Sequence, residues 1–194
     1  MGGVPVTAGN VDSGQNMIYE TISPLITVKS ESKRAMEMLA LNPRVVFIGQ
    51  NVAYGGHWLY DSLADVPADR KIEMPVAENL QMGISIGLAL AGYVPVSCYR
   101  MDFLLLAMDQ LVNHLDKLSE MSQGGFRPKV IVRVIVTPTK PLDPGPQHRQ
   151  DHTEALKLML KHTPVLTAAY RRYVMDAYEM AMKYDGSAVV VEVP

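Results

Sequence analysis

The chain has 194 residues with a hydrophobic content of 48%, and its 18 Lys and Arg nearly balance its 20 Asp and Glu, leaving a formal net charge of −2. At roughly 150 residues per domain, this length corresponds to about one domain and excludes a large multidomain enzyme. Because no basic cluster stands out, the sequence indicates neither a nucleic-acid partner nor an anionic membrane surface. Cys98 is the only cysteine, which excludes an internal disulfide and favours a reducing compartment, the cytoplasm or an organelle matrix.

Two segments stand apart from the rest of the sequence, the N-terminal residues and one long uncharged stretch. Residues 1–16 are rich in Gly, Val, Asn and Ser without a period, so we expect a flexible tail there and a single domain over residues 17–194. Residues 79–99 carry no charge and are long enough to span a bilayer. Their glycines, Pro95 and the change from a helical to an extended pattern near Gly92 instead predict a buried helix followed by a buried strand, with no membrane contact.

Helical and extended patterns alternate along the chain. A helix is predicted from Ser30, and Asn42-Pro43 ends it before an apolar run at 44–49. Further strands are predicted at 94–99, 129–136, 165–168 and 188–193, and helices at 78–91, 103–118, 152–161 and 171–184. Strands that are apolar on both faces and separated by helices predict an α/β fold, a mostly parallel sheet with helices on both faces. Ligands of such sheets lie beyond the carboxyl ends of the strands, so we expect a site in the loops after Ile48, Tyr99 and Val136.

The first candidate for chemistry is Glu78, the only charged residue between Glu73 and Arg100. It opens a helix that is otherwise apolar. The helix dipole favours the anionic form of this carboxylate, whereas burial opposes it. The alternative interpretation is a helix-starting glutamate that only satisfies exposed amides.

The helix that follows has a face with little side-chain bulk, made by Gly83, Ser85 and Gly87. Glycine inside a helix costs roughly 1 kcal/mol of helix propensity, so a close backbone approach is the expected compensation. Packing on the chain's own sheet and a subunit interface are both consistent with this face.

An aromatic residue follows the strand predicted at 94–99. Phe103 lies just beyond its carboxyl end, where a ring can stack on a flat ligand. Helical spacing equally allows Phe103 to be a core residue, so the pattern leaves both interpretations open.

A proline-rich loop follows the strand predicted at 129–136. Four prolines within residues 137–148 stiffen the segment that presents His148, and a fixed imidazole suits acid–base chemistry. His152 lies four residues later, but no further ligands at recognisable spacing complete a zinc site, so no metal site is predicted. Four other histidines are expected to be surface residues: His57, His114, His152 and His162.

Together and in this order, these segments resemble the pyrimidine-binding domain of thiamine-diphosphate enzymes of the transketolase group, above all the β subunits of 2-oxo-acid dehydrogenases. The resemblance covers about residues 44–194. Its most specific part is Pro75-x-x-Glu78-Asn79 with the glycine-spaced helix. The other matching pieces are residues 47–56, 102–113 and 145–150, with Glu154-Ala155.

The resemblance implies roles for individual residues. Glu78 matches the glutamate that hydrogen-bonds the far nitrogen of the cofactor's aminopyrimidine, and Phe103 matches the aromatic residue that stacks on that ring. His148 matches a histidine that faces the substrate, so Glu78 and His148 are the expected catalytic residues. Asn51 and Val52, which belong to the matching segment 47–56, are the remaining expected cofactor contacts. The cofactor performs the carbanion chemistry while the protein orients it and tunes its proton affinity.

The sequence also departs from the family pattern. Gln50-Asn51 replaces an acidic pair, and no Gly-Asp-Gly motif for diphosphate and magnesium occurs, the nearest match being Tyr184-Asp185-Gly186-Ser187. The chain ends at residues 189–194, where a typical β subunit continues into a C-terminal domain. We therefore expect half of a thiamine-diphosphate site, completed by an α-type subunit that binds the diphosphate and Mg²⁺ in a heterotetramer. The helix with Gly83 and Gly87 is expected to mediate self-association.

The activity that the resemblance implies is decarboxylation of a 2-oxo acid with transfer of the remaining acyl or aldehyde unit. One alternative is ketol transfer of the transketolase or deoxyxylulose-phosphate-synthase type, because Gly145-Pro146-Gln147-His148 also resembles the Gly-Pro-x-His of those enzymes. The other is a non-catalytic assembly module that has kept the fold.

Overall fold

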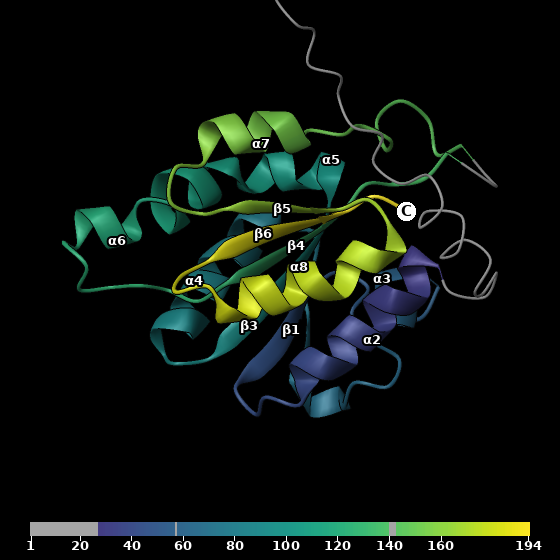
Figure 1. Ribbon diagram of the computed structural model, residues 1–194, viewed down its shortest axis with the longest axis horizontal. Helices are drawn as coiled ribbons and strands as arrows, with labels where there is room; N and C mark the ends of the chain where they lie inside the picture. The colour runs from purple at the N-terminus through teal and green to yellow at the C-terminus, as the bar shows by residue number, and fades with distance from the viewer. Residues whose placement is uncertain (1–26, 57, 140–142) are drawn as a thin grey trace, which may run out of the picture.

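The computed structural model describes residues 27–56, 58–139 and 143–194 (Figure 1). The tail predicted at residues 1–16 and the surface position predicted for His57 lie outside these ranges. Within them, no helix combines the length and the apolar character needed to cross a membrane.

Six parallel strands form one sheet in the order β2-β1-β3-β4-β6-β5. This confirms the predicted α/β fold with a parallel sheet. The short edge strand β2 was not predicted because it has only three residues and a charged residue at each end. The strands are β1 (Val45–Gly49), β2 (Lys71–Glu73), β3 (Val94–Arg100), β4 (Ile131–Ile135), β5 (Val165–Ala168) and β6 (Ala188–Glu192).

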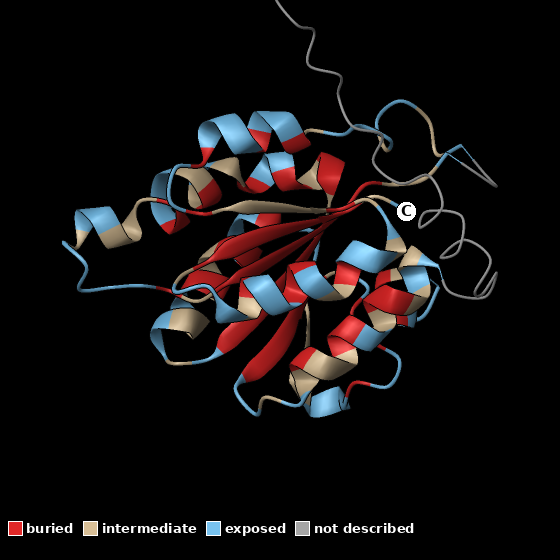
Figure 2. Ribbon diagram, in the orientation of Figure 1, coloured by how far each residue is buried: buried red, intermediate tan, exposed pale blue. Residues whose placement is uncertain are grey.

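Helices cover both faces of the sheet, as predicted (Figure 1). One face packs against α2 (Val28–Ala40), α3 (Trp58–Ser62) and α8 (Arg171–Lys183). The other packs against α4 (Glu78–Leu90), α5 (Met101–Leu104) with the helical turns that follow it, and α7 (Thr153–Met159). Two short elements, η1 (Ala68–Arg70) and α6 (Leu118–Met121), complete the described helices. The central strands between these layers are buried on both faces (Figure 2).

Two predicted helices differ in detail from the observed ones. α2 begins earlier than predicted because Thr27 caps it: its hydroxyl accepts from the Ser30 amide, and the Ser30 hydroxyl accepts from the Thr27 amide. The helix predicted at 103–118 is instead divided into α5, a 3₁₀ turn η2 (Leu105–Ala107) and a π-helix η3 (Asp109–Leu115). A burial repeat of three or four residues is common to all three helix types, so the pattern alone does not distinguish them.

The core contains a buried ion pair that the apolar strand patterns did not reveal. Arg133 on β4 donates through Nε to Glu192 on β6 at 2.8 Å, and both side chains are fully buried. Arg133 also donates to the Ser62 hydroxyl on α3, and the Tyr178 hydroxyl on α8 donates to Glu192. The pair therefore fixes two helices to one face of the sheet.

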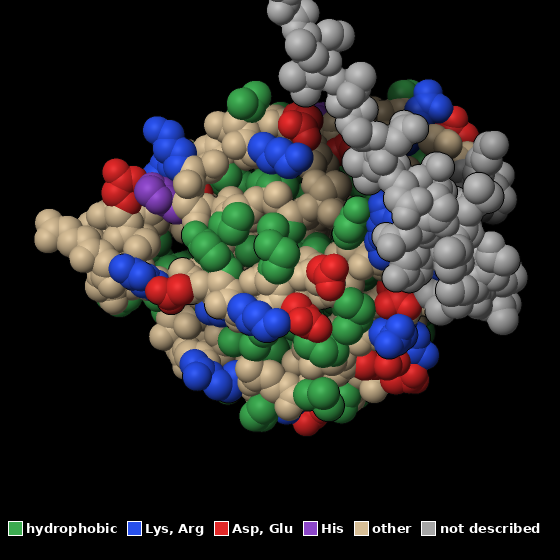
Figure 3. Space-filling view, viewed as in Figure 1, with side chains coloured by type: hydrophobic (Ala, Val, Ile, Leu, Met, Phe, Trp, Pro, Cys, Tyr) green, Lys and Arg blue, Asp and Glu red, His purple; other side chains and the backbone are tan. Residues whose placement is uncertain are grey.

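The β5 edge of the sheet is less completely covered. Val165, Leu166 and Thr167 are only half-buried, whereas the strands inside the sheet are fully buried. Hydrophobic side chains gather on the face seen in Figure 3, between α7 and α8. Exposed members of these two helices are Leu158, Met159, Tyr173 and Met180.

Candidate functional site

The chain reverses its direction across the sheet at β1 and β3. From β1 it passes to α3 on one face, and from β3 it passes to α5 on the other. Such a switch point opens a crevice at the carboxyl ends of the two strands, where ligands of parallel sheets bind. A cavity of about 110 Å³ lies there, lined among the described residues by Gln50, Asn51, Leu59, Glu78, Gln81, Cys98, Tyr99, Arg100 and Phe103.

Glu78 is the carboxylate of this cavity. It is the first residue of α4 and only 5% exposed. Gln50 Nε2 donates to Glu78 Oε1 at 3.0 Å, and no other hydrogen bond to the Glu78 carboxylate is present in the described part of the chain. The side chain is thus held at one oxygen, while the other oxygen remains available to a ligand in the cavity.

Gln81, one turn after Glu78, forms the floor of the cavity and was not predicted. Its Nε2 lies within hydrogen-bond distance of Ile48 O, Ser97 Oγ and Cys98 O, at 3.3, 3.2 and 3.0 Å. The amide therefore fixes the start of α4 to both β1 and β3. Its isolated position in an apolar helix was the signal that sequence analysis did not use.

The close approach of β1 and β3 beneath the cavity explains Gly49. A Cβ at this position would lie 2.7 Å from Cys98 O, which is closer than side-chain atoms approach a backbone oxygen. Glycine allows the two strands to end side by side at the cavity.

The loop after β1 is held by Glu73, which ends β2. The Glu73 carboxylate accepts from the amides of Asn51, Val52 and Ala53 at 2.7, 2.9 and 2.8 Å. Asn51 adopts φ 56° and lines the cavity, and Asn is among the residues that tolerate this conformation best. The structure thus places the Glu73 carboxylate on the backbone amides that begin at Asn51, the second residue of the Gln50-Asn51 pair.

The two residues predicted as further cofactor contacts are placed differently. Asn51 is exposed at the cavity. Val52 is fully buried in the core, and its amide is taken by Glu73. The structure therefore leaves Val52 no side-chain contact with the cavity.

Phe103 and His148 come together although they are far apart in the sequence. Their ring centroids are 5.4 Å apart in an edge-on arrangement with an interplanar angle of 74°. The Arg100 guanidinium lies 5.2 Å from the centroid of the same Phe103 ring. Phe103 thus connects the end of β3 with the loop after β4.

Several polar atoms near His148 are buried without a partner. Asp102 Oδ1 accepts from the Gln150 amide at 3.2 Å, but Asp102 Oδ2, His148 Nδ1 and His152 Nε2 have no hydrogen-bond partner among the described residues. The prediction of His152 as a surface residue is therefore wrong, because its ring is half-buried at the start of α7 and one nitrogen is enclosed. Such atoms are rare in folded proteins and require an explanation.

The other two described surface histidines are confirmed. His114 and His162 are both exposed, and each lies close to a carboxylate, Asp109 and Glu120 respectively. Among the described residues, no group of three or more His, Cys, Asp or Glu is arranged to hold a metal ion.

Burial keeps the other titratable groups of the cavity neutral. It raises the pKa of the Cys98 thiol to about 11 and raises the pKa of the Tyr99 hydroxyl well above its usual value. Glu78 and Arg100 are the remaining titratable residues among the described residues that line the cavity.

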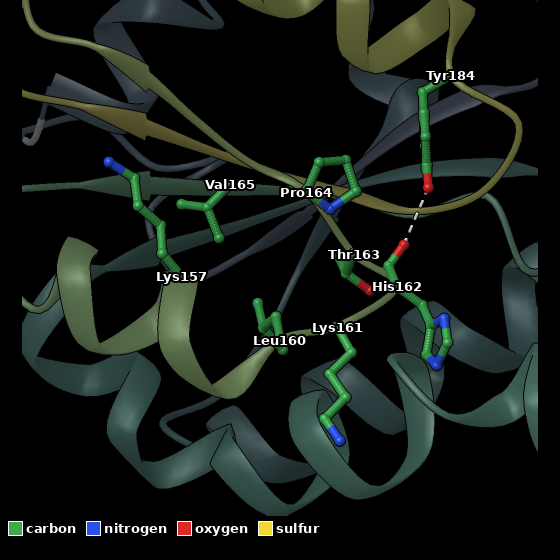
Figure 4. Close-up of a pocket in the computed structure, with 8 residues that line it drawn as sticks. All are labelled: Lys157, Leu160, Lys161, His162, Thr163, Pro164, Val165 and Tyr184. Atoms are coloured by element: carbon green, nitrogen blue, oxygen red, sulfur yellow. Dashed lines mark hydrogen bonds between the residues drawn. The ribbon is translucent and has the colours of Figure 1, made fainter.

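A second cavity, of about 190 Å³, lies at the opposite edge of the sheet (Figure 4). It is lined by residues of α7, of the segment leading into β5 and by Tyr184, whose hydroxyl donates to the His162 carbonyl at 3.1 Å. The strands begin at this end of the sheet, away from Glu78. Parallel sheets bind ligands at the carboxyl ends of their strands, so we assign the site to the cavity lined by Glu78.

The glycine face of α4 is open at its second glycine. A Cβ at Gly87 would meet nothing within 4 Å, whereas one at Gly83 would lie 3.8 Å from the Gln110 side chain. Packing on the chain's own sheet therefore does not account for Gly87.

The chain is similar to known proteins in both sequence and fold. The family model described as "Transketolase, pyrimidine binding domain" matches residues 24–192. The 3-methyl-2-oxobutanoate dehydrogenase subunit beta of Mycobacterium tuberculosis (strain CDC 1551 / Oshkosh) is 33% identical over 158 residues, which cover 76% of this chain and 44% of the relative. The pyruvate dehydrogenase E1 component subunit beta of Mesostigma viride is 31% identical over 134 residues, which cover 67% of this chain and 39% of the relative.

The chain spans less than half the length of these curated relatives. A solved structure titled "Split gene transketolase, inactive beta4 tetramer" matches with a TM-score of 0.66 at 19% identity, covering 86% of this chain and 51% of that one. At this identity the match supports the fold.

Proposed function

The chain belongs to the family of transketolase pyrimidine-binding domains, and from that premise we propose that it forms the pyrimidine half of a thiamine-diphosphate site. The enzyme it serves decarboxylates a 2-oxo acid and transfers the remaining acyl or aldehyde unit, as a β-type subunit. The names of the 2-oxo-acid dehydrogenase relatives support this assignment. The observation that carries it is the enclosed Glu78 carboxylate, held at one oxygen and open to the switch-point cavity at the other.

The residues present fit an aminopyrimidine ring. The free oxygen of Glu78 accepts or returns a proton at the ring's far nitrogen, while the Gln50 amide keeps the carboxylate oriented. Phe103 offers a ring for stacking at the wall of the same cavity. When bound, thiamine diphosphate supplies the carbanion chemistry at the substrate ketone.

His148 is assigned to the substrate. An edge-on contact with Phe103 restrains the His148 ring, and within the described part of the chain its Nδ1 has no hydrogen-bond partner. It can therefore hydrogen-bond a substrate carboxylate or a developing alkoxide, which stabilises charge where it forms. We also assign a cofactor contact to Asn51, which lines the cavity.

We assign the diphosphate and its Mg²⁺ to an α-type partner in a heterotetramer. The cavity of about 110 Å³ is well below the roughly 300–1,000 Å³ of complete ligand pockets. A second chain that closes over it accounts for the difference. Gel filtration and thiamine-diphosphate titration, first of this chain and then with an α subunit containing Gly-Asp-Gly, test the assignment. Tight magnesium-dependent binding by this chain alone would contradict it.

Glu78→Gln tests the catalytic role. In the reconstituted complex we expect a loss of kcat of about 10²-fold or more, because the amide no longer accepts a proton. Assembly with the α subunit, measured by gel filtration, should be unchanged. Full activity of the Glu78→Gln variant would support the interpretation of this chain as a non-catalytic assembly module. Turnover of sugar phosphates in place of pyruvate by the reconstituted enzyme would indicate ketol transfer.

We further propose that α4 mediates self-association through Gly83 and Gly87. Because Gly87 is exposed with open space around it, Gly87→Leu should fold normally yet block a close helix–helix approach. Light scattering should then show a lower mass than for the unmodified chain. An unchanged mass would argue against this interface.

A further inference from the structure

We propose that Arg100 binds the anionic group of the substrate, a carboxylate or a phosphate. The inference deepens the proposed function and rests on it for the statement that the anion belongs to a substrate. The geometry of the proposed anion-binding site at Arg100 depends only on residues of this chain.

Arg100 is the last residue of β3, so its side chain starts at the edge of the sheet where the cavity lies. Nε and Nη2 lie 3.3 and 3.2 Å from Thr137 Oγ1, just beyond β4. The guanidinium lies over the Phe103 ring, with its carbon 5.2 Å from the ring centroid. Two neutral groups therefore hold the guanidinium in a defined orientation.

The charge of Arg100 is not neutralised within the described residues. No carboxylate of this part of the chain lies within ion-pair distance, in contrast to Arg133, Arg127 and Arg149. Glu78, the acid of the same cavity, is instead engaged by Gln50. A half-buried cation without a counter-ion attracts an anion from solution.

The guanidinium also keeps donors free for a ligand. The guanidinium has five N–H groups. The Nε–H and one Nη2–H donate to Thr137, so both Nη1–H groups and the second Nη2–H remain for a ligand. These donors form the planar fork that binds two oxygens of a carboxylate or phosphate at once.

His148 contacts the same aromatic ring as Arg100. Its imidazole packs edge-on with Phe103, and its Nδ1 has no hydrogen-bond partner among the described residues. A substrate at Phe103 thus meets a fixed cation from β3 and an imidazole from the loop after β4. Arg100 then recognises the anion, which leaves His148 for the developing alkoxide and Glu78 for proton transfer.

The test is an anion titration of the full chain, followed through the Nε–H signals of the arginines in ¹H–¹⁵N spectra at constant ionic strength set with NaCl. Pyruvate probes for a carboxylate and inorganic phosphate probes for a phosphate. We expect one of them to shift the Arg100 signal saturably. Saturation by pyruvate assigns a 2-oxo acid, and saturation by phosphate assigns a phosphorylated substrate at the same site.

Three variants give the control. Arg100→Gln should weaken binding of that anion about 10-fold or more, and Arg100→Lys, which keeps the charge but loses the fork, should fall between. Arg44, just before β1, is the matched control: among the described residues its side chain hydrogen-bonds only a neutral acceptor, the Gly92 carbonyl. The Arg44→Gln variant should bind the anion normally. An unchanged affinity in Arg100→Gln, or no saturable shift with either anion, overturns the proposal.

This outcome is independent of the cofactor. Anion binding at Arg100 in a chain that never assembles a thiamine-diphosphate site would defeat the proposed function alone. An active reconstituted enzyme in which Arg100→Gln leaves KM for the 2-oxo acid unchanged would defeat the present inference alone.

Discussion

At the start of the sheet, the Asp116 carboxylate is buried and accepts from the amides of Lys161, His162 and Thr163 at 2.8 to 3.2 Å. At the carboxyl end of the sheet, Asp102 Oδ2 and His148 Nδ1 are also enclosed but have no hydrogen-bond partner in the part of the chain that the structure describes. Buried polar groups that are satisfied stabilise a fold, whereas unsatisfied ones reduce stability. The difference indicates that the end of the sheet with Asp116 stabilises the fold, whereas the end with Asp102 and His148 retains unused hydrogen-bonding capacity for a ligand.

Asp116→Ala should have the largest effect on stability. It removes the acceptor of three amides that remain partly enclosed, and an unsatisfied buried group costs about 1–3 kcal/mol, so we expect a loss of about 3 kcal/mol in the free energy of unfolding. Urea denaturation measures this. Asp109→Ala, an exposed aspartate of the same segment, should change it by less than about 0.5 kcal/mol. Equal losses of stability in Asp116→Ala and Asp109→Ala would contradict the stabilising role of Asp116.

Acid should weaken the same edge. Burial alone would raise the pKa of Asp116, but hydrogen bonds from Lys117 and the three amides outweigh it and hold the pKa below its usual value of 3.8. A lowered folded pKa gives stability that is complete above the unfolded value and is lost as pH falls through the folded value. Stability should therefore fall below about pH 3.8, and less steeply in Asp116→Asn. Parallel acid profiles for the two proteins would count against this role.

His148→Phe should have a small effect of the opposite kind. The new ring keeps an aromatic contact with Phe103 and removes an unpartnered buried nitrogen, so we expect stability to stay within about 0.5 kcal/mol or to rise. The same urea experiment applies. A loss comparable with that of Asp116→Ala would show that His148 serves the fold.

The smallest expected effect concerns Cys98, whose thiol should not react with an alkylating reagent in the folded protein. Burial raises its pKa to about 11, so the thiol of the native chain should resist alkylation at pH 8 and react once urea unfolds it. Rapid labelling of the folded protein would show that the floor of the cavity opens.

The extent of sequence-based prediction differs between local and long-range features. The strand at β5 and the start of α4 at Glu78 were predicted because apolar runs and isolated charges are local signals. The partners of Arg133, Gln81 and Arg100 were not, because each lies on another element. Which buried polar groups are satisfied becomes visible only when β1, β3 and β4 are side by side.

The most direct test of the account is a titration of the full chain with the free aminopyrimidine half of thiamine, which requires neither diphosphate nor partner. We predict saturable ¹H–¹⁵N shifts at the Gln50 side-chain amide and at Phe103, lost in Glu78→Gln. Shifts confined to the cavity of Lys157 and Tyr184, or equal shifts in the Glu78→Gln variant, would contradict the assignment of the site to the switch point between β1 and β3.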